Sequence, residues 1–176
     1  MPSFILRAWR KEDAPAIARH ANNEKIAANL RDVFPSPYTL QDAEQFIVSC
    51  LQADEEEQLC RVIERDGQAI GSVCLTRGTD VYRKSAEIGY WLAEPFWNRG
   101  IMSRAIKQCC AQAFDRWDIV RIYAEPYAYN IASQRALQKA GFQYEGRCRK
   151  SVYKNGQIKD SCLYALLREE LNKRAD

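Results

Sequence analysis

A helix start led by glycine is the feature of this sequence with the clearest potential for ligand chemistry. The sequence predicts a strand over Ser85–Leu92, a turn, and a helix that begins just after Arg99 and Gly100. The first backbone N–H groups of a helix lack a partner within the helix, and the helix dipole adds partial positive charge. Such a start can bind the diphosphate of a nucleotide-like cofactor. The alternative is a plain helix cap, and the turn is not a P-loop, because it lacks the glycine–lysine pair.

A second candidate is a serine on the inner side of a predicted helix. Ser133 falls on the same side as Leu137 and two alanines in the helix expected over Asn130–Ala140. A buried hydroxyl needs a hydrogen-bond partner. Ser133 either bonds to a carbonyl one turn earlier or faces a ligand cleft between the helix and the sheet. The Asn130 side chain also has two interpretations, as a helix cap or as an amide directed at a ligand.

The third candidate is a carboxylate within an apolar strand. Glu87 alternates with buried positions, so it shares one strand face with Gly89 and Trp91. It lies either on a solvated face or inside a cleft, where partial loss of water would suit a carboxylate to general-base work.

Charge and composition exclude several classes of function. The chain has 176 residues and a net charge of +3, which is too mild to predict nucleic-acid binding. No run approaches the roughly 18 apolar residues of a membrane helix, and the N-terminal segment lacks a signal-peptide core. We therefore expect neither a nucleic-acid nor a membrane partner.

The cysteine pattern is scattered. No C-x-x-C pair occurs, and His20 is the only histidine, so no metal site is expected. A disulfide framework is not expected either, and the sequence favours reduced thiols in a cytoplasmic protein. The seven cysteines are Cys50, Cys60, Cys74, Cys109, Cys110, Cys148 and Cys162.

The predicted elements run strand, helices, three strands, helix, strand, helix, two strands. This order indicates a mixed sheet with helices on its faces, in one domain over residues 1–168 and a charged tail over 169–176. The expected strands and helices are Phe4–Trp9, a helical region from Lys11 to Leu30, a helix capped by Thr39, a hairpin over Leu59–Gly78, Ser85–Leu92, Ile101–Trp117, Ile119–Tyr123, Asn130–Ala140, and a hairpin over Phe142–Leu167.

Two segments together carry a family resemblance. AEIGYWLAEPFWNRGIMSRA, followed by NIASQRALQKAGF and a terminal hairpin, resembles the GNAT family of acetyl-CoA-dependent N-acetyltransferases. Within this family the chain is most similar to the RimJ/RimL-like branch, which includes ribosomal-protein N-terminal acetyltransferases. The likeness extends from Phe4 to Leu167. It implies an α/β (α+β) fold with a mixed, mostly antiparallel sheet of about seven strands, helices on both faces, and a splay at the acyl-CoA cleft.

The resemblance also implies a cofactor site. Acetyl-CoA would be the co-substrate, with no metal. Its diphosphate would lie at the helix start, and its pantetheine arm would pair with strand backbone in the splay. The residues expected to hold it are Trp91, Leu92, Arg99, Gly100, Ile101, Met102, Ser103 and Asn130.

For catalysis, the position of the tyrosine that many relatives use to protonate the departing thiolate is Leu137 here. The RimL-like branch offers a serine instead, which falls on Ser133. A carboxylate proposed as base in some RimL-like enzymes aligns near Val152, so Glu87 is the better candidate base, acting through water.

The resemblance implies a primary-amine acceptor, either a protein N-terminus or a small molecule, and leaves room for a homodimer. The alternative is a non-catalytic acyl-CoA-binding or sensor domain. The basic residues of the last hairpin are expected to form a solvated face. They are Arg147, Arg149, Lys150, Lys154 and Lys159.

Overall fold

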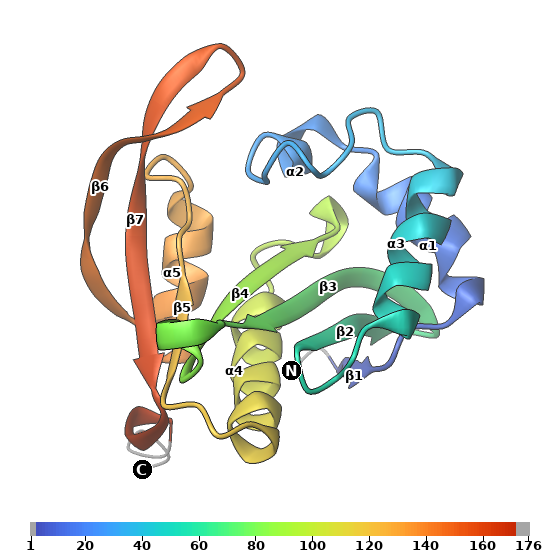
Figure 1. Cartoon of the computed structure of the whole chain (residues 1–176). Coiled ribbons are helices and arrows are strands. Elements are labelled where there is room, and N and C mark those ends of the chain that lie inside the picture. The colour runs from blue at the N-terminus through green and yellow to red at the C-terminus, as the bar shows by residue number, and fades with distance from the viewer. Residues whose placement is uncertain (1–2, 172–176) are drawn as a thin grey trace.

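A seven-stranded sheet runs through the molecule in the order β1-β2-β3-β4-β5-β7-β6 (Figure 1). Neighbouring strands are antiparallel except β4 and β5, which are parallel. This confirms the expected mixed, mostly antiparallel sheet. The strands are β1 (Ile5–Arg7), β2 (Gln58–Arg65), β3 (Gln68–Arg77), β4 (Ser85–Leu92), β5 (Arg121–Ala124), β6 (Gln143–Lys154) and β7 (Gln157–Leu167).

The computed structural model describes residues 3–171. Within this range, Arg168–Glu170 forms a single helical turn after β7. The remainder of the predicted charged tail, from residue 172 onward, lies outside the described residues. No helix among residues 3–171 is long and apolar enough to cross a membrane.

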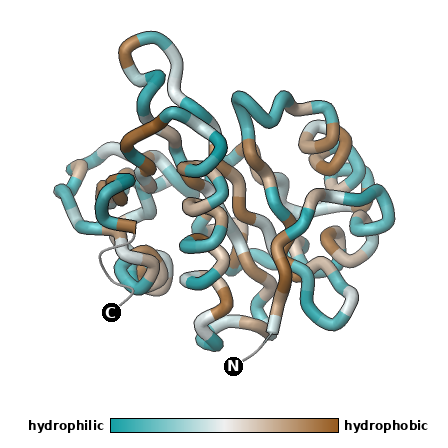
Figure 2. The backbone as a smooth tube through the Cα atoms, turned by 90° about the horizontal axis from the view of Figure 1, so that it is seen from below, coloured by the Kyte–Doolittle hydropathy of each residue, from teal (hydrophilic) through white to brown (hydrophobic). Residues whose placement is uncertain are grey.

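Helices cover both faces of the sheet, as expected. One face packs against α1 (Ala14–Ala21) and α3 (Leu40–Gln52), and the other against α4 (Ile101–Arg116) and α5 (Ile131–Ala140). The short α2 (Glu24–Ala27) lies across from the projecting β6–β7 hairpin (Figure 1). Hydrophobic segments run along the central strands, between the helical layers (Figure 2).

Side-chain alternation along the strands sorts residues between the two cores. In β4, Ile88 and Leu92 join the core under α4, whereas Trp91 packs against the core under α1 and α3. The helix ends also follow the sequence. The Thr39 hydroxyl accepts a bond from the backbone N–H of Asp42, whose carboxylate accepts from the backbone N–H of Thr39.

One predicted boundary differs from the structure. The pattern of β-branched residues predicts a strand over Ile119–Tyr123, but β5 spans Arg121–Ala124. Ile119 is nevertheless fully buried. Burial alone therefore produces the apolar signal there, two residues before the chain joins the sheet.

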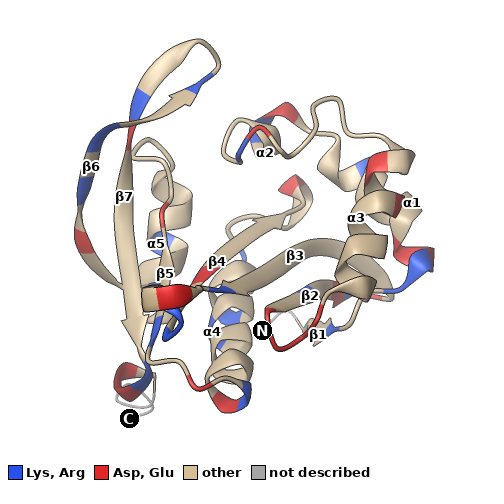
Figure 3. Cartoon of the chain, in the orientation of Figure 1, with Lys and Arg blue, Asp and Glu red and all other residues tan. Residues whose placement is uncertain are grey.

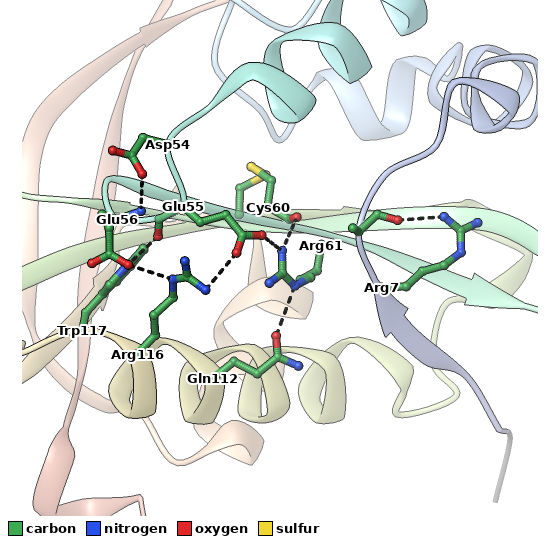
Figure 4. Close-up of polar contacts among 11 residues, drawn as sticks. Arg7, Asp54, Glu55, Glu56, Cys60, Arg61, Gln112, Arg116 and Trp117 are labelled. Atoms are coloured by element: carbon green, nitrogen blue, oxygen red, sulfur yellow. Dashed lines mark hydrogen bonds and ion pairs between the residues drawn. A yellow bond between two sulfur atoms is a disulfide. The ribbon is translucent and has the colours of Figure 1, made fainter.

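A polar cluster joins the turn before β2 to the end of α4 (Figure 4). The Glu55 carboxylate pairs with Arg61 at 2.8 Å and with Arg116 at 2.9 Å. The Trp117 indole N–H donates to the carbonyl of Glu55 at 2.8 Å. These contacts fix the C-terminal end of α4, and therefore the direction in which its N-terminal end points.

The expectation that all cysteines are free thiols is wrong at one pair. Cys60 of β2 and Cys74 of β3 form a disulfide, with Cα atoms 4.1 Å apart. The two residues are direct partners in the β2–β3 register, which places their side chains on the same face. The Cys50 sulfur from α3 lies within 4.8 Å of both. This proximity depends on strand pairing, so cysteine spacing alone could not reveal it.

Gly71 lets β3 approach β4 closely at the end of β4. A Cβ atom at this position would lie 2.5 Å from the carbonyl oxygen of Trp91 and 3.1 Å from the Cα of Leu92. Both contacts are with backbone, so neither can be relieved by a side-chain rotation. Glycine at this position therefore helps to place the end of β4.

We expect Gly71→Ala to lower the free energy of unfolding by about 1–3 kcal/mol, because the added methyl group must push β4 away. Gly89→Ala is the matched control in the neighbouring strand, since a Cβ there meets nothing within 4 Å. It should leave the stability nearly unchanged. Denaturant titration of both variants measures the difference, and equal stabilities would contradict this explanation.

Candidate functional site

The two parallel strands in the middle of the sheet pair over only a short length. β4 and β5 are joined by three residue pairs, ending at Glu87 and Tyr123. β4 then continues to Leu92 with its other edge still paired to β3. The sheet is therefore open from Ile88 onward, which confirms the expected splay.

Backbone polar groups of β4 point into this opening. The backbone N–H of Ala93 donates to the carbonyl of Ile70 at 2.8 Å, and the carbonyl of Ser85 accepts from the backbone N–H of Gly78 at 2.8 Å. Odd-numbered residues from Ser85 to Ala93 therefore direct their backbone hydrogen-bonding groups towards β3, and even-numbered residues direct theirs away from it. The backbone of Trp91 therefore faces β3, whereas that of Tyr90 and Leu92 faces the opening. The Leu92 carbonyl already accepts a bond from the Trp97 indole N–H at 2.6 Å.

A cavity of about 870 Å³ occupies the opening and reaches both faces of the sheet. Its lining comes from α4, α5 and β4, from the segment after β5, and from the loop before α3. All the residues singled out from the sequence lie on its wall. They are Glu87, Trp91, Leu92, Arg99, Gly100, Ile101, Met102, Ser103, Asn130 and Ser133.

The helix start at Gly100 is open to the cavity. Gly100 has φ 69°, and a Cβ there would meet nothing within 4 Å, so glycine serves the left-handed backbone conformation and not a tight contact. Met102 is half-buried and packs against the core. The cations Arg99, Arg135 and Lys139 also lie on the cavity wall, and they add positive charge to that of the α4 N-terminus.

Ser133 is bonded across the cleft. Its hydroxyl lies 2.7 Å from the hydroxyl of Tyr90, so its described partner is a β4 side chain and not a carbonyl of its own helix. Burial raises the pKa of Tyr90, and the bond to Ser133 offsets this only in part. The phenol therefore stays protonated near neutral pH and can donate a proton or a hydrogen bond.

Asn130 acts as a helix cap. Its side-chain oxygen accepts a hydrogen bond from the backbone N–H of Ser133 at 3.1 Å. This satisfies one free donor at the start of α5. Because Asn130 also lies on the cavity wall, the cap and the ligand-facing amide are compatible.

Glu87 lies on the opposite face of the sheet from Ser133. Its carboxylate forms an ion pair with Arg31, and their side chains are 31% and 70% exposed. Around them the cavity is lined by Phe34, Phe46 and Trp91. This side of the cavity is mostly apolar, with charges at its mouth.

The segment over residues 28–32 closes part of that mouth. The hydroxyl of Tyr127 donates to the carbonyl of Leu30 at 3.1 Å, and that of Tyr129 donates to Ala28. At the hairpin tip, Lys154 donates to Asp32 at 2.6 Å. Contacts between segments that are far apart in the sequence therefore cover part of the cavity.

The expected solvated basic face of the last hairpin is wrong in part. Basic residues do follow β6 (Figure 3). However, the Lys154 side chain is only 7% exposed because it turns inward to Asp32. Arg147 pairs with Asp160 at 2.7 Å but remains 59% exposed, as expected.

Sequence reasoning missed Tyr90, Arg135 and Lys139. Tyr90 belongs to the apolar face of β4 by alternation, so its hydroxyl gave no signal. Arg135 and Lys139 lie four residues apart and hence on one side of α5, a pattern typical of any solvated helix face.

With this geometry in view, the family is clear. The chain matches the acetyltransferase (GNAT) domain over residues 3–143, and it belongs to that family. The matched residues include β1 to β5 and the glycine-led start of α4, whereas β7 lies beyond them.

Curated relatives point to the same family. The chain is 34% identical over 105 residues to a putative ribosomal N-acetyltransferase, YdaF, of Bacillus subtilis. That match covers 60% of this chain and 57% of YdaF. It is 35% identical over 117 residues to a probable N-acetyltransferase, YjcK, of the same organism, covering 66% of this chain and 65% of YjcK. The chain therefore spans less than two thirds of the length of either relative.

Among solved structures, RimJ of Mycobacterium smegmatis in complex with CoA-disulfide superimposes with a TM-score of 0.87. The two proteins are 25% identical, and the match covers 98% of this chain and 85% of RimJ. The two chains thus share the overall fold.

Proposed function

We propose that this chain is an acetyl-CoA-dependent N-acetyltransferase that acts on a primary amine. The observation that carries the proposal is one cavity through the splayed sheet, with a glycine-led helix start and several cations on one face and an apolar, charge-rimmed mouth on the other. Membership of the GNAT family and the CoA-bound RimJ neighbour support it.

The residues present suit an acyl-CoA. The backbone amides at the start of α4 would receive the diphosphate, with Arg99, Arg135 and Lys139 adding charge. The backbone groups of Tyr90 and the N–H of Leu92 would pair with the amides of the pantetheine arm, as a neighbouring strand would. Asn130 would border the same arm.

The reaction would be direct attack of the amine on the thioester carbonyl. A backbone N–H of β4 in the opening would polarise that carbonyl. The Ser133 hydroxyl would donate a proton to the departing thiolate, and Tyr90 would replace it through their hydrogen bond. Holding both substrates in one cavity supplies much of the acceleration.

We propose a protein N-terminal amine as the acceptor, supported by the likeness to a putative ribosomal N-acetyltransferase. Such an acceptor implies action in the cytoplasm, where ribosomes are found. A small-molecule amine is the second candidate for the acceptor. A non-catalytic acyl-CoA sensor is the alternative to an enzyme, because Leu137 replaces the tyrosine used by many relatives.

Gly100→Glu should weaken acetyl-CoA binding at least 100-fold, because it places a carboxylate at the proposed diphosphate site, where like charges repel. Isothermal titration calorimetry measures the affinity. The substitution also forces a left-handed backbone onto a residue with a Cβ, and that effect needs its own control.

Gly67→Glu supplies this control. Gly67 also has a positive φ, 76°, with nothing within 4 Å of a built Cβ, and it lies in the β2–β3 turn away from the cavity. It should share the backbone strain and retain acetyl-CoA binding. If both variants bind equally well, the anion site at α4 is refuted.

Ser133→Ala should lower kcat about 100-fold with little change in acetyl-CoA affinity, because it removes the proposed proton donor. Ser49→Ala is the control, since the Ser49 hydroxyl donates to the carbonyl of Phe46 at 2.7 Å on α3 and Ser49 does not line the cavity. Steady-state kinetics decide the point, and an unchanged kcat in Ser133→Ala would remove this role.

Release of free CoA thiol, measured with acetyl-CoA and a panel of amines, tests the function itself. The panel holds hexapeptides beginning with serine, alanine or methionine, together with spermidine. Turnover on a peptide supports the N-terminal acceptor, and turnover on spermidine alone favours the small amine. Tight acetyl-CoA binding without turnover on any amine would indicate the sensor.

A further inference from the structure

Glu125 lies where the two central strands part. It follows β5 directly, two residues after Tyr123, the last β5 residue paired with β4. Its side chain is exposed and lines the cavity. The charges of Glu87 and Glu125 both act on the Tyr123 phenol, whose pKa is raised first by burial and then by these carboxylates. Glu125 therefore lies near Glu87, on the acceptor face of the sheet.

The backbone around Glu125 is held by β7. The N–H of Cys162 donates to the carbonyl of Pro126 at 2.9 Å, and the N–H of Ala128 donates to that of Asp160 at 2.8 Å. Tyr127 and Ser161 form an isolated β-bridge between these bonds. Glu125 is thus carried by a segment that runs alongside the sheet and is fixed to it.

A chain of hydroxyls orients the Glu125 carboxylate. Ser161, which is 0% exposed, donates its hydroxyl hydrogen to Glu125. The hydroxyl of Ser151 lies 2.6 Å from that of Ser161. The Ser151 hydroxyl also lies 3.0 Å from the carbonyl of Cys148, and its single hydrogen can be donated either there or to Ser161. A bulge in β6 between Cys148 and Val152 brings Ser151 to this position.

Glu125 and Glu87 differ in their partners. The Glu87 carboxylate is already paired with the guanidinium of Arg31. Glu125 takes part in none of the ion pairs found among residues 3–171, and its described partner is the neutral Ser161 hydroxyl. A carboxylate can accept about four hydrogen bonds, so Glu125 retains acceptor capacity for a cation that enters the cavity.

We propose that the Glu125 carboxylate binds the ammonium group of the acceptor and takes its proton, and that Ser161 and Ser151 position that carboxylate. The neutral nitrogen then attacks the thioester carbonyl carbon. As the C–N bond forms and the C–S bond breaks, the second proton of the nitrogen passes to water in the cavity. Ser133 gives its hydroxyl proton to the sulfur, and a proton from the same water restores the Ser133–Tyr90 pair. Glu125 returns its proton to solvent, to which it is exposed.

This assignment rests on the proposed acetyltransferase function and names the base that the function requires. Glu87 is not assigned as the base, because the charge of the Glu87 carboxylate is balanced by Arg31. The two carboxylates would then border the same acceptor with different roles.

Glu125→Gln tests the proposal, since glutamine keeps the shape and can still accept the Ser161 hydrogen bond but cannot take a proton. With acetyl-CoA and the peptides and spermidine of the panel, kcat/KM should fall by about 10²–10⁴. Acetyl-CoA affinity should not change. Glu145→Gln is the matched control, because Glu145 of β6 pairs with Arg121 and does not line the cavity. It should leave kcat/KM unchanged.

Two further variants separate chemistry from structure. In Glu125→Ala, added sodium formate should restore part of the turnover, because a small carboxylate can occupy the vacated position. Ser161→Ala should lower kcat by up to about 100-fold through a misoriented carboxylate, with the KM for acetyl-CoA unchanged. A parallel loss in both parameters would indicate a structural role for Ser161 instead.

The outcomes are distinct. An active wild type with an equally active Glu125→Gln variant overturns the role of Glu125 and leaves the proposed function intact. A loss of turnover in Glu125→Ala that formate does not restore also overturns its role as proton acceptor. A wild type inactive on every amine of the panel counts against the proposed function and the ammonium site together.

Discussion

The parting of β4 from β5 is the constraint on which the rest of the structure depends. Parallel pairing stops at Glu87 and Tyr123, yet β4 continues to Leu92 along β3. An unpaired strand edge in the middle of a sheet is costly unless something satisfies its backbone groups. Helices pack on both faces of the sheet beside this edge, and the Cβ-free position at Gly71 lets β3 approach the end of β4 closely. The candidate site is the direct product of this arrangement.

Because the opening passes through the sheet, its two sides can differ in chemistry. On the α4 and α5 side lie the glycine-led helix start, several cations and the Ser133–Tyr90 hydroxyl pair. On the α1 and α3 side lie aromatic residues and two carboxylates. A negatively charged ligand and a positively charged one can therefore approach the same point from opposite faces without competing for one entrance.

The sequence predicted what depends on local patterns. The start of α4 at Gly100 and the position of Ser133 on α5 follow from helix periodicity and capping, and family resemblance placed both in a cleft. The sequence could not predict contacts that depend on strand register and loop placement. Tyr90 and Ser133 are 43 residues apart, and Lys154 and Asp32 are 122 apart. The Cys60–Cys74 disulfide and the Ser161 bond to Glu125 are of the same kind, because each needs the folded sheet before its partners meet.

The free edge of β4 has a thermodynamic meaning of its own. A ligand that pairs with Tyr90 and Leu92 would take the place of a missing strand, so part of the hydrogen bonding of the sheet would belong to the ligand. Folding and ligand binding are then linked, and the stability gained would grow as RT ln(1 + [L]/Kd). The protein would be most resistant to unfolding when its ligand is abundant, and its thermal stability would report the supply of the metabolite it uses.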